Sequence, residues 1–98
     1  MQVRIHELAV KELDEAIDWY DLQSGGLGKR FKEAVVENVN KIRKNPGWFL
    51  IEKGQIHKAY IPKFPYKILF TVENDNLIII WAIAHLHRKP WYWQNRVN

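Results

Sequence analysis

Residues 66–84 read YKILFTVENDNLIIIWAIA, and this stretch decides the fold. Its first part, residues 66–72, alternates between two faces, one of which is strongly apolar. That face carries Tyr66, Ile68, Phe70 and Val72. Its last part, residues 77–84, is apolar on both faces, which favours a central strand. The polar residues 73–76 favour a turn, so the whole stretch predicts a β-hairpin.

Two shorter segments are predicted to extend this sheet. Residues 56–61, which read IHKAYI, precede the hairpin and are strand-like. Near the N-terminus, Val3 and Ile5 alternate with Arg4 and His6, which is the two-residue period of a half-buried strand. The sheet therefore has strands from both ends of the chain.

Two amphipathic helices are predicted between the first strand and the rest of the sheet. The first begins at about Leu8, and its apolar stripe comprises Ala9, Leu13, Ala16, Ile17 and Tyr20. The second helix has the stripe Phe31, Ala34, Val35, Asn38, Val39 and Ile42. The first helix is broken by Ser24, Gly25, Gly26 and Gly28, and the second ends at Asn45-Pro46-Gly47. So short a connection predicts an antiparallel helical hairpin.

The predicted fold class is α+β, in the order strand, helix, helix, strand, strand, strand. We expect an antiparallel sheet of about four strands, covered on one face by the N-terminal helical hairpin. A chain of 98 residues gives room for a single domain, 1–98.

The net charge is +4, and the charged residues are unevenly distributed. Most of the acids lie in the first half of the chain, whereas residues 83–98 contain none. The basic residues of that tail are His85, His87, Arg88, Lys89 and Arg96. This pattern favours an acidic or polyanionic partner, although solubility alone would also explain a modest positive charge.

The expected compartment is the cytoplasm. The chain has no cysteine, which fits a reducing environment. Its N-terminus lacks the long apolar run of a signal peptide, and no stretch approaches the length of a membrane span. We therefore expect no membrane association.

The basic and aromatic segment after the hairpin is the candidate site. Together with two lysines on neighbouring strands, it gives a predicted surface for a polyanion or a protein target: Lys58, Lys67, Arg88, Lys89, Trp91 and Trp93. Arginine and lysine suit phosphate, and tryptophan offers a stacking surface for a base. Each residue also has a structural interpretation, because the tryptophans can pack, His85 can be a hydrogen-bonded structural residue, and the lysines can be solvated.

Metal and cofactor chemistry are not predicted. The chain lacks cysteine ligands, a His and Glu pair at metal-binding spacing, and a glycine-rich phosphate loop. Any RNA hydrolysis would be the metal-free kind, in which the 2′-hydroxyl of the RNA attacks and the protein supplies a base, an acid and phosphate stabilisation. The catalytic candidates in that case are Arg88, His85, His87 and Tyr92.

The order and spacing of four segments resemble the RelE/ParE toxin superfamily over nearly the whole chain. These segments are AVKEL at 9–13, KNP at 44–46, FPYKILF at 64–70 and HLHRKPWYW at 85–93. The resemblance implies the toxin of a bacterial type II toxin–antitoxin system, of the kind associated with growth inhibition and plasmid stabilization. The long helical hairpin and the His-x-x-Arg-x-Pro ending at residues 85–90 look closer to the ParE-like branch.

Three functions remain open from the sequence. A ParE-like protein is expected to poison DNA gyrase, whereas a RelE-like protein is a ribosome-dependent mRNA endonuclease. Lys67 stands where those nucleases usually have arginine. The third hypothesis is a non-toxic module that only binds an antitoxin. In each case the resemblance implies a cognate antitoxin, which we expect to be acidic, and a dimer or a hetero-oligomer with it.

Overall fold

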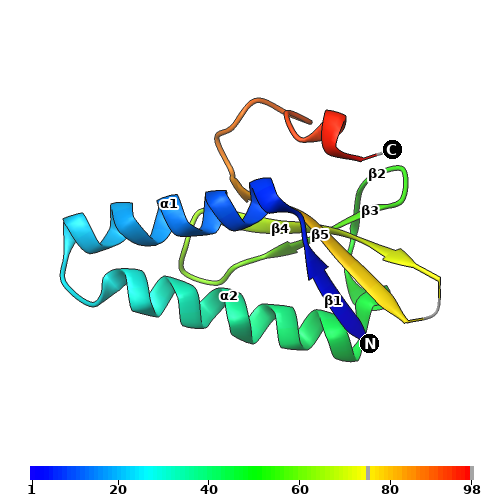
Figure 1. Ribbon diagram of the computed structural model, residues 1–98, viewed down its shortest axis with the longest axis horizontal. Helices are drawn as coiled ribbons and strands as arrows, with labels where there is room; N and C mark the ends of the chain where they lie inside the picture. Colours follow the sequence, from blue (N-terminus) through cyan, green and yellow to red (C-terminus); the bar gives the residue numbers. More distant parts are fainter. Residues whose placement is uncertain (75, 98) are drawn as a thin grey trace.

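A helical hairpin lies along one face of a twisted sheet (Figure 1). This computed structural model describes residues 1–74 and 76–97. The helices are α1 (Glu7–Gln23) and α2 (Leu27–Lys44), and a 3-10 turn, η1 (Pro46–Trp48), follows them. The strands are β1 (Gln2–Ile5), β2 (Ile51–Lys53), β3 (Ile56–Tyr60), β4 (Tyr66–Glu73) and β5 (Leu77–His85). A second 3-10 turn, η2 (Gln94–Arg96), lies near the C-terminus.

The sheet confirms the α+β class and differs from the expected sheet in two details. The order is β1-β5-β4-β3-β2, so five strands are present and β5 is internal, as its apolar faces predicted. β1 pairs in parallel with β5, with Val3 opposite Ile78, which makes the sheet mixed rather than antiparallel. The direction of β1 was not predictable because it depends on β5, a partner far along the chain. The extra strand, β2, was missed because it is only 3 residues long, too short for its alternation to be recognised.

The β4–β5 hairpin is antiparallel, as predicted, with Glu73 opposite Leu77. The predicted turn at residues 73–76 includes Asp75, which lies outside the described residues. The register shifts between Leu69 and Phe70, because Leu69 faces Ala82 and Phe70 faces Ile80. Trp81 is thus the extra residue of a bulge, and its indole Nε1 donates to the hydroxyl of Thr71 at 2.9 Å.

The turn between the helices is shorter than its glycines suggested. α1 ends at Gln23 and Gly26 adopts φ +85°, which favours glycine. Gly28, expected to break a helix, lies inside α2 instead. A Cβ at Gly28 would stand 2.5 Å from the backbone oxygen of Ile17, so glycine is required there by the close approach of α1.

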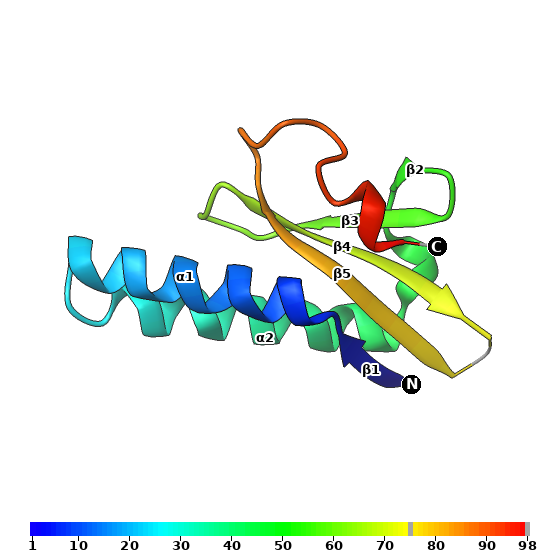
Figure 2. The same cartoon turned by 45° about the horizontal axis from the view of Figure 1, so that its top comes forward.

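The two faces of the sheet are covered differently. On the helix side the core contains Ala9, Ala16, Phe31, Val35, Ile42, Ile68, Phe70, Ile78 and Ile80. On the opposite side a smaller apolar cluster contains Ile56, Leu69, Ala82, Ala84 and Trp93. Figure 2 shows how the segment after β5 turns back across that second face toward the C-terminus. We call residues 86–97 the tail; it supplies Trp93 to the cluster.

None of the helices among the described residues is long and apolar enough to cross a membrane.

Candidate functional site

The candidate site begins where β5 ends at His85. The strand does not continue to His87, so the two rings do not lie on one strand face. They still meet edge to face, with ring centroids 5.2 Å apart, and the backbone N–H of His87 donates to Nδ1 of His85 at 3.1 Å. His85 is half-buried against Tyr66, whereas His87 is exposed.

Arg88 lies exposed above an aromatic platform. Its guanidinium carbon is 3.9 Å from the centroid of the Tyr92 ring, a cation–π distance. Within residues 1–74 and 76–97, no carboxylate forms an ion pair with Arg88. The hydrogen-bond donors of Arg88 are therefore not taken up by any carboxylate of the described residues.

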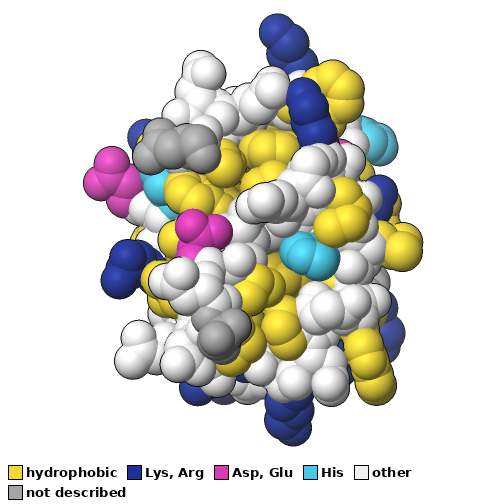
Figure 3. Space-filling model, turned by 90° about the vertical axis from the view of Figure 1, so that its right-hand side faces the viewer, with side chains coloured by type: hydrophobic (Ala, Val, Ile, Leu, Met, Phe, Trp, Pro, Cys, Tyr) yellow, Lys and Arg dark blue, Asp and Glu magenta, His cyan; other side chains and the backbone are white. Residues whose placement is uncertain are grey.

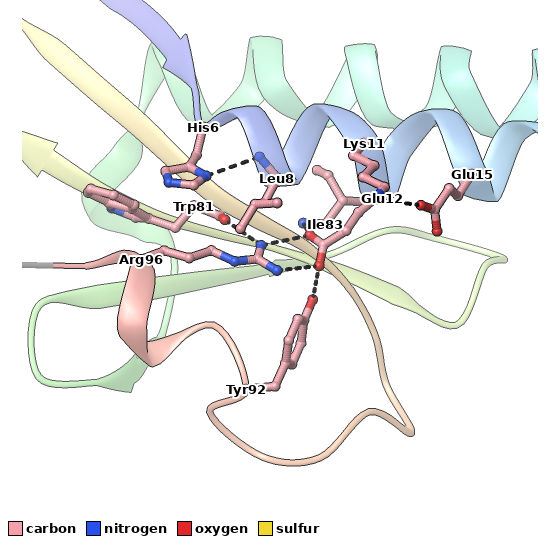
Figure 4. A network of polar contacts seen from close by, with 9 residues as sticks. All are labelled: His6, Leu8, Lys11, Glu12, Glu15, Trp81, Ile83, Tyr92 and Arg96. Atoms are coloured by element: carbon pink, nitrogen blue, oxygen red, sulfur yellow. Dashed lines mark hydrogen bonds and ion pairs between the residues drawn. The ribbon is translucent and has the colours of Figure 1, made fainter.

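Glu12 of α1 holds the platform in place (Figure 4). The phenol of Tyr92 donates to Oε2 of Glu12 at 2.7 Å, and Arg96 binds the same carboxylate through Nη1 at 3.0 Å and Nη2 at 2.8 Å. The backbone N–H of Ile83 donates to Oε1 at 3.0 Å. One carboxylate thus accepts four hydrogen bonds, one from β5 and three from Tyr92 and Arg96 of the tail segment that follows β5.

The position of Glu12 follows from the end of β1. β1 pairs with β5 only as far as Ile5 opposite Ile80, and the N–H of His6 donates to the carbonyl of Ile80 at 2.8 Å. The chain then leaves the sheet as α1, so the N–H of Ile83 has no strand partner on that side. Glu12, one turn into the helix, accepts that hydrogen bond.

Sequence reasoning missed this network. The apolar stripe that it assigned to the first helix leaves out Glu12, and it counted Arg96 among the charges of an acid-free tail. Glu12 lies three residues after Ala9 and four before Ala16, both buried, so it borders the apolar stripe. That spacing was the sequence signal that Glu12 lies at the edge of the buried face. The structure was needed to show that its side chain is only 14% exposed.

The buried network changes how its members ionise. Burial raises the pKa of the Tyr92 phenol well above its ordinary value of 10.0, and the hydrogen bond and negative charge of Glu12 raise it further. Burial would lower the pKa of Arg96, but the hydrogen bonds and charge of Glu12 outweigh it and raise that pKa. Burial also raises the pKa of Tyr66, and the nearby positive charge of Arg88 partly opposes this.

The two sheet lysines share one internal acid. Their side chains lie on the same face of β3 and β4, as predicted, but both point to Glu52 near the end of β2. Lys67 Nζ lies 2.8 Å from Glu52 Oε1 and Lys58 Nζ lies 3.8 Å from it. Glu52 therefore balances one of the two positive charges and binds Lys67 more closely than Lys58.

The remaining tail residues divide into buried and exposed. Trp93 is 3% exposed and packs against Leu69 and Ala84, so its indole fills the core in place of the stacking surface assigned to it. Trp91 is 45% exposed, and Lys53 Nζ lies 4.0 Å from the centroid of its ring. Lys89 is exposed. Of the predicted binding surface, the structure leaves Arg88, Lys89 and part of Trp91 open to a partner.

A groove of about 550 Å³ runs beside the tail, between α1 and the β4–β5 pair. Its apolar lining includes Ala16, Trp19, Tyr66 and Ile83, and Arg88 lies at its rim. Trp19 is 55% exposed, which is high for so large a ring. Glu12, which is paired with Arg96, and the exposed Glu15 also line the groove. The groove thus combines an apolar floor with two carboxylates and the open positive charge of Arg88.

Positive charge does not collect on the end of the molecule that Figure 3 faces. There, hydrophobic side chains lie near the centre and lysine and arginine side chains mostly around the rim. No group of three or more potential metal ligands from His, Cys, Asp and Glu occurs among residues 1–74 and 76–97.

Comparison with known proteins supplies the family. The sequence profile described as "ParE toxin of type II toxin-antitoxin system, parDE" matches residues 3–90. A solved structure titled "Chromosomal ParDE TA system from P. aeruginosa" superposes with a TM-score of 0.78 at 19% identity, covering 89% of this chain and 97% of that chain. A search for curated relatives found no match. Because the profile spans nearly all of the chain, the protein belongs to the ParE toxin family of type II toxin–antitoxin systems.

Proposed function

We propose that this protein arrests bacterial growth by binding DNA gyrase, and that the contact centres on Arg88. The observation that carries the proposal is the exposed guanidinium of Arg88, fixed at 3.9 Å above Tyr92 and unpaired with any carboxylate of the described residues. An arginine held in this way loses little side-chain entropy when it meets an anionic partner. Membership in the ParE toxin family supports the toxin role.

The same contacts weigh against RNA cleavage of the RelE type. Tyr92, one of the candidate catalytic groups, donates a hydrogen bond to Glu12 at 2.7 Å and has a raised pKa. Lys67 is occupied by Glu52 at 2.8 Å. A metal-free nuclease needs its acid, base and cations directed at one phosphate. Among the described residues, His85, His87 and Arg88 lie together where β5 meets the tail, whereas Tyr92 and Lys67 are each bound to an internal acid.

The cognate antitoxin is proposed to be an acidic segment that occupies the groove beside α1. The groove offers an apolar floor for a side chain such as leucine or phenylalanine, and Arg88 at its rim suits a carboxylate. An antitoxin bound there would cover Arg88 and so block the target contact. The toxin and antitoxin would then form a hetero-oligomer in the cytoplasm, where gyrase acts.

Purified protein added to DNA gyrase tests the target. We expect loss of supercoiling by the wild type and by Lys32→Ala, and weak inhibition by Arg88→Ala. Lys32 is a matched control because it is an exposed cation on α2, away from the tail. Unchanged supercoiling with the wild-type protein would exclude gyrase.

Induced expression in bacteria separates the alternatives. DNA synthesis that stops first, with an SOS response, supports the gyrase proposal. Translation that stops first, with mRNA cut on ribosomes, supports the RelE-type nuclease. Normal growth at a high level of folded protein supports a non-toxic antitoxin-binding module.

The antitoxin proposal has a separate test. Association with the purified antitoxin should slow as salt rises, because attraction between opposite charges is screened. Trp19→Ala should weaken the complex, whereas Trp48→Ala, at an 82% exposed tryptophan outside the groove, should not. Equal losses in both variants would place the antitoxin elsewhere.

A further inference from the structure

Two separate attachments hold the tail to the body of the protein. Trp93 lies in the apolar cluster on the sheet, and Glu12 binds Tyr92 and Arg96 from α1. Arg88 belongs to neither attachment, because among the described residues it forms no ion pair with Glu12 and it is not part of the apolar cluster. Its contact with the rest of the tail is the ring of Tyr92.

The geometry assigns Glu12 as a positioning residue for Arg88. Its Oε2 accepts from the Tyr92 hydroxyl at 2.7 Å, which fixes one edge of the ring. The face of the same ring then supports the guanidinium at 3.9 Å. The inference that this matters for toxicity rests on the proposed function, whereas the positioning itself does not.

The carboxylate is well suited to this task because it is itself fixed. Its side chain is only 14% exposed and accepts hydrogen bonds from Ile83 of β5 and from both terminal nitrogens of Arg96. A carboxylate with four donors around it has little freedom to rotate. The Tyr92 ring is thereby fixed relative to β5 and α1.

The backbone between Arg88 and the two attachments is strained, which is independent support. Trp91 adopts φ +58°, a left-handed conformation that is rare for a bulky side chain. Such a conformation persists only where the surroundings determine it. Here Tyr92 and Trp93 follow Trp91 directly, and both are held. Loss of the Glu12 contact would therefore release the segment that carries Arg88.

Tyr92→Phe is the central variant, because it removes the hydrogen bond to Glu12 and keeps both the ring and the Glu12–Arg96 ion pair. The first measurement is the NMR order parameter of the Nε–Hε bond of Arg88. We expect it to fall in Tyr92→Phe and in Glu12→Gln, and to stay unchanged in Glu15→Gln. Glu15 is a matched control because it lies on the same helix, 68% exposed.

The second measurement is a double-mutant cycle on growth arrest, in cells without antitoxin. Tyr92→Phe should raise the inducer level needed for arrest about tenfold, the scale expected from one hydrogen bond to a charged group. In an Arg88→Ala background the same change should have almost no effect, because Tyr92 acts through Arg88. A purely structural role would give the same loss in both backgrounds.

The two measurements distinguish a wrong assignment of Glu12 from a wrong proposed function. An Arg88 order parameter that Tyr92→Phe leaves unchanged would overturn the assignment of Glu12, even if the protein is a potent toxin. Equal effects of Tyr92→Phe in both backgrounds would also overturn it. A wild-type protein that does not arrest growth would reject the proposed function and leave the order parameter as the deciding result. Should Glu12→Gln fail to fold, Tyr92→Phe still decides.

Discussion

Glu12 and Arg96, 84 residues apart in the chain, form a bidentate ion pair that binds the tail to α1. The nitrogen to oxygen distances are 3.0 and 2.8 Å, and the side chains are 14% and 11% exposed. Breaking an ion pair this buried costs more stability than breaking one on the surface, because the remaining charge is poorly solvated by water.

Arg96→Ala should therefore lower the free energy of unfolding by about 3 kcal/mol, because Glu12 keeps its charge without a countercharge. Denaturation in urea measures the change. The control is Lys11→Ala, which breaks the exposed Lys11–Glu15 pair at 3.9 Å and should cost less than about 0.5 kcal/mol. Similar losses in the two variants would mean that the Glu12–Arg96 pair is solvated.

Stability should fall at alkaline pH because of Tyr92. Its pKa in the folded protein is raised above the ordinary 10.0, so the native state keeps a proton that the unfolded chain loses. Unfolding then releases a proton, and the free energy of unfolding declines as pH rises above about 10 toward the folded pKa. Tyr20 and Tyr66, whose pKa values are also raised, add to the decline.

The contribution of Tyr92 is measured by comparing variants in urea at about pH 9 and about pH 11, on either side of the usual tyrosine pKa. Tyr92→Phe should show a smaller decline than the wild type. Tyr60→Phe, at a side chain 53% exposed, should decline like the wild type. A decline that is the same in all three proteins would contradict the prediction.

Trp93→Ala should be among the most destabilising substitutions in the tail. The indole is 3% exposed and belongs to the apolar cluster that contains Leu69 and Ala84, so its removal leaves a cavity that costs about 3 to 5 kcal/mol. Trp91→Ala, at a ring that is 45% exposed, should cost about 1 kcal/mol or less. Thermal denaturation ranks the two variants, and the opposite order would show that Trp91 is the ring that seals the second face.

Gly28→Ala should strain the helical hairpin. The added Cβ would meet the backbone oxygen of Ile17 at 2.5 Å and the carboxylate of Asp21 at 2.6 Å, so α1 and α2 must separate at a cost of about 1 to 3 kcal/mol. Gly25→Ala has no atom within 4 Å and should stay within about 0.5 kcal/mol of the wild type. A neutral Gly28→Ala would show that the two helices move apart easily.

Lys67→Met should leave growth arrest unchanged, in contrast to Arg88→Ala. The ammonium of Lys67 is 2.8 Å from Glu52, and Lys58 remains beside that carboxylate at 3.8 Å when Lys67 is replaced. We expect a stability loss of about 1 kcal/mol and the same inducer level for arrest. A Lys67→Met protein that no longer arrests growth would bring the sheet lysines back into the contact surface and would favour the nuclease alternative.

Local pattern was enough to predict most of the elements. The alternation at residues 66–72 and the continuous apolar run at 77–84 identified the hairpin, and the helical spacing of Ala9, Ala16 and Tyr20 identified α1. These periods come from the geometry of the element itself, so they need no knowledge of the partner. The order of the segments and the FPYKILF and HLHRKPWYW motifs were also enough to indicate the family.

Only the tertiary structure decided what the tail does. The sequence placed Arg88 and Arg96 in one acid-free segment, yet Arg96 pairs with an acid of α1 while Arg88 stays open. It could not distinguish Trp91 from Trp93, although Trp91 is 45% exposed and Trp93 is 3% exposed. It also predicted an antiparallel sheet, whereas β1 lies parallel to β5. Each of these outcomes depends on where β1 ends and on how the tail turns back over the sheet, which are contacts between residues far apart in the chain and leave no periodic trace in it.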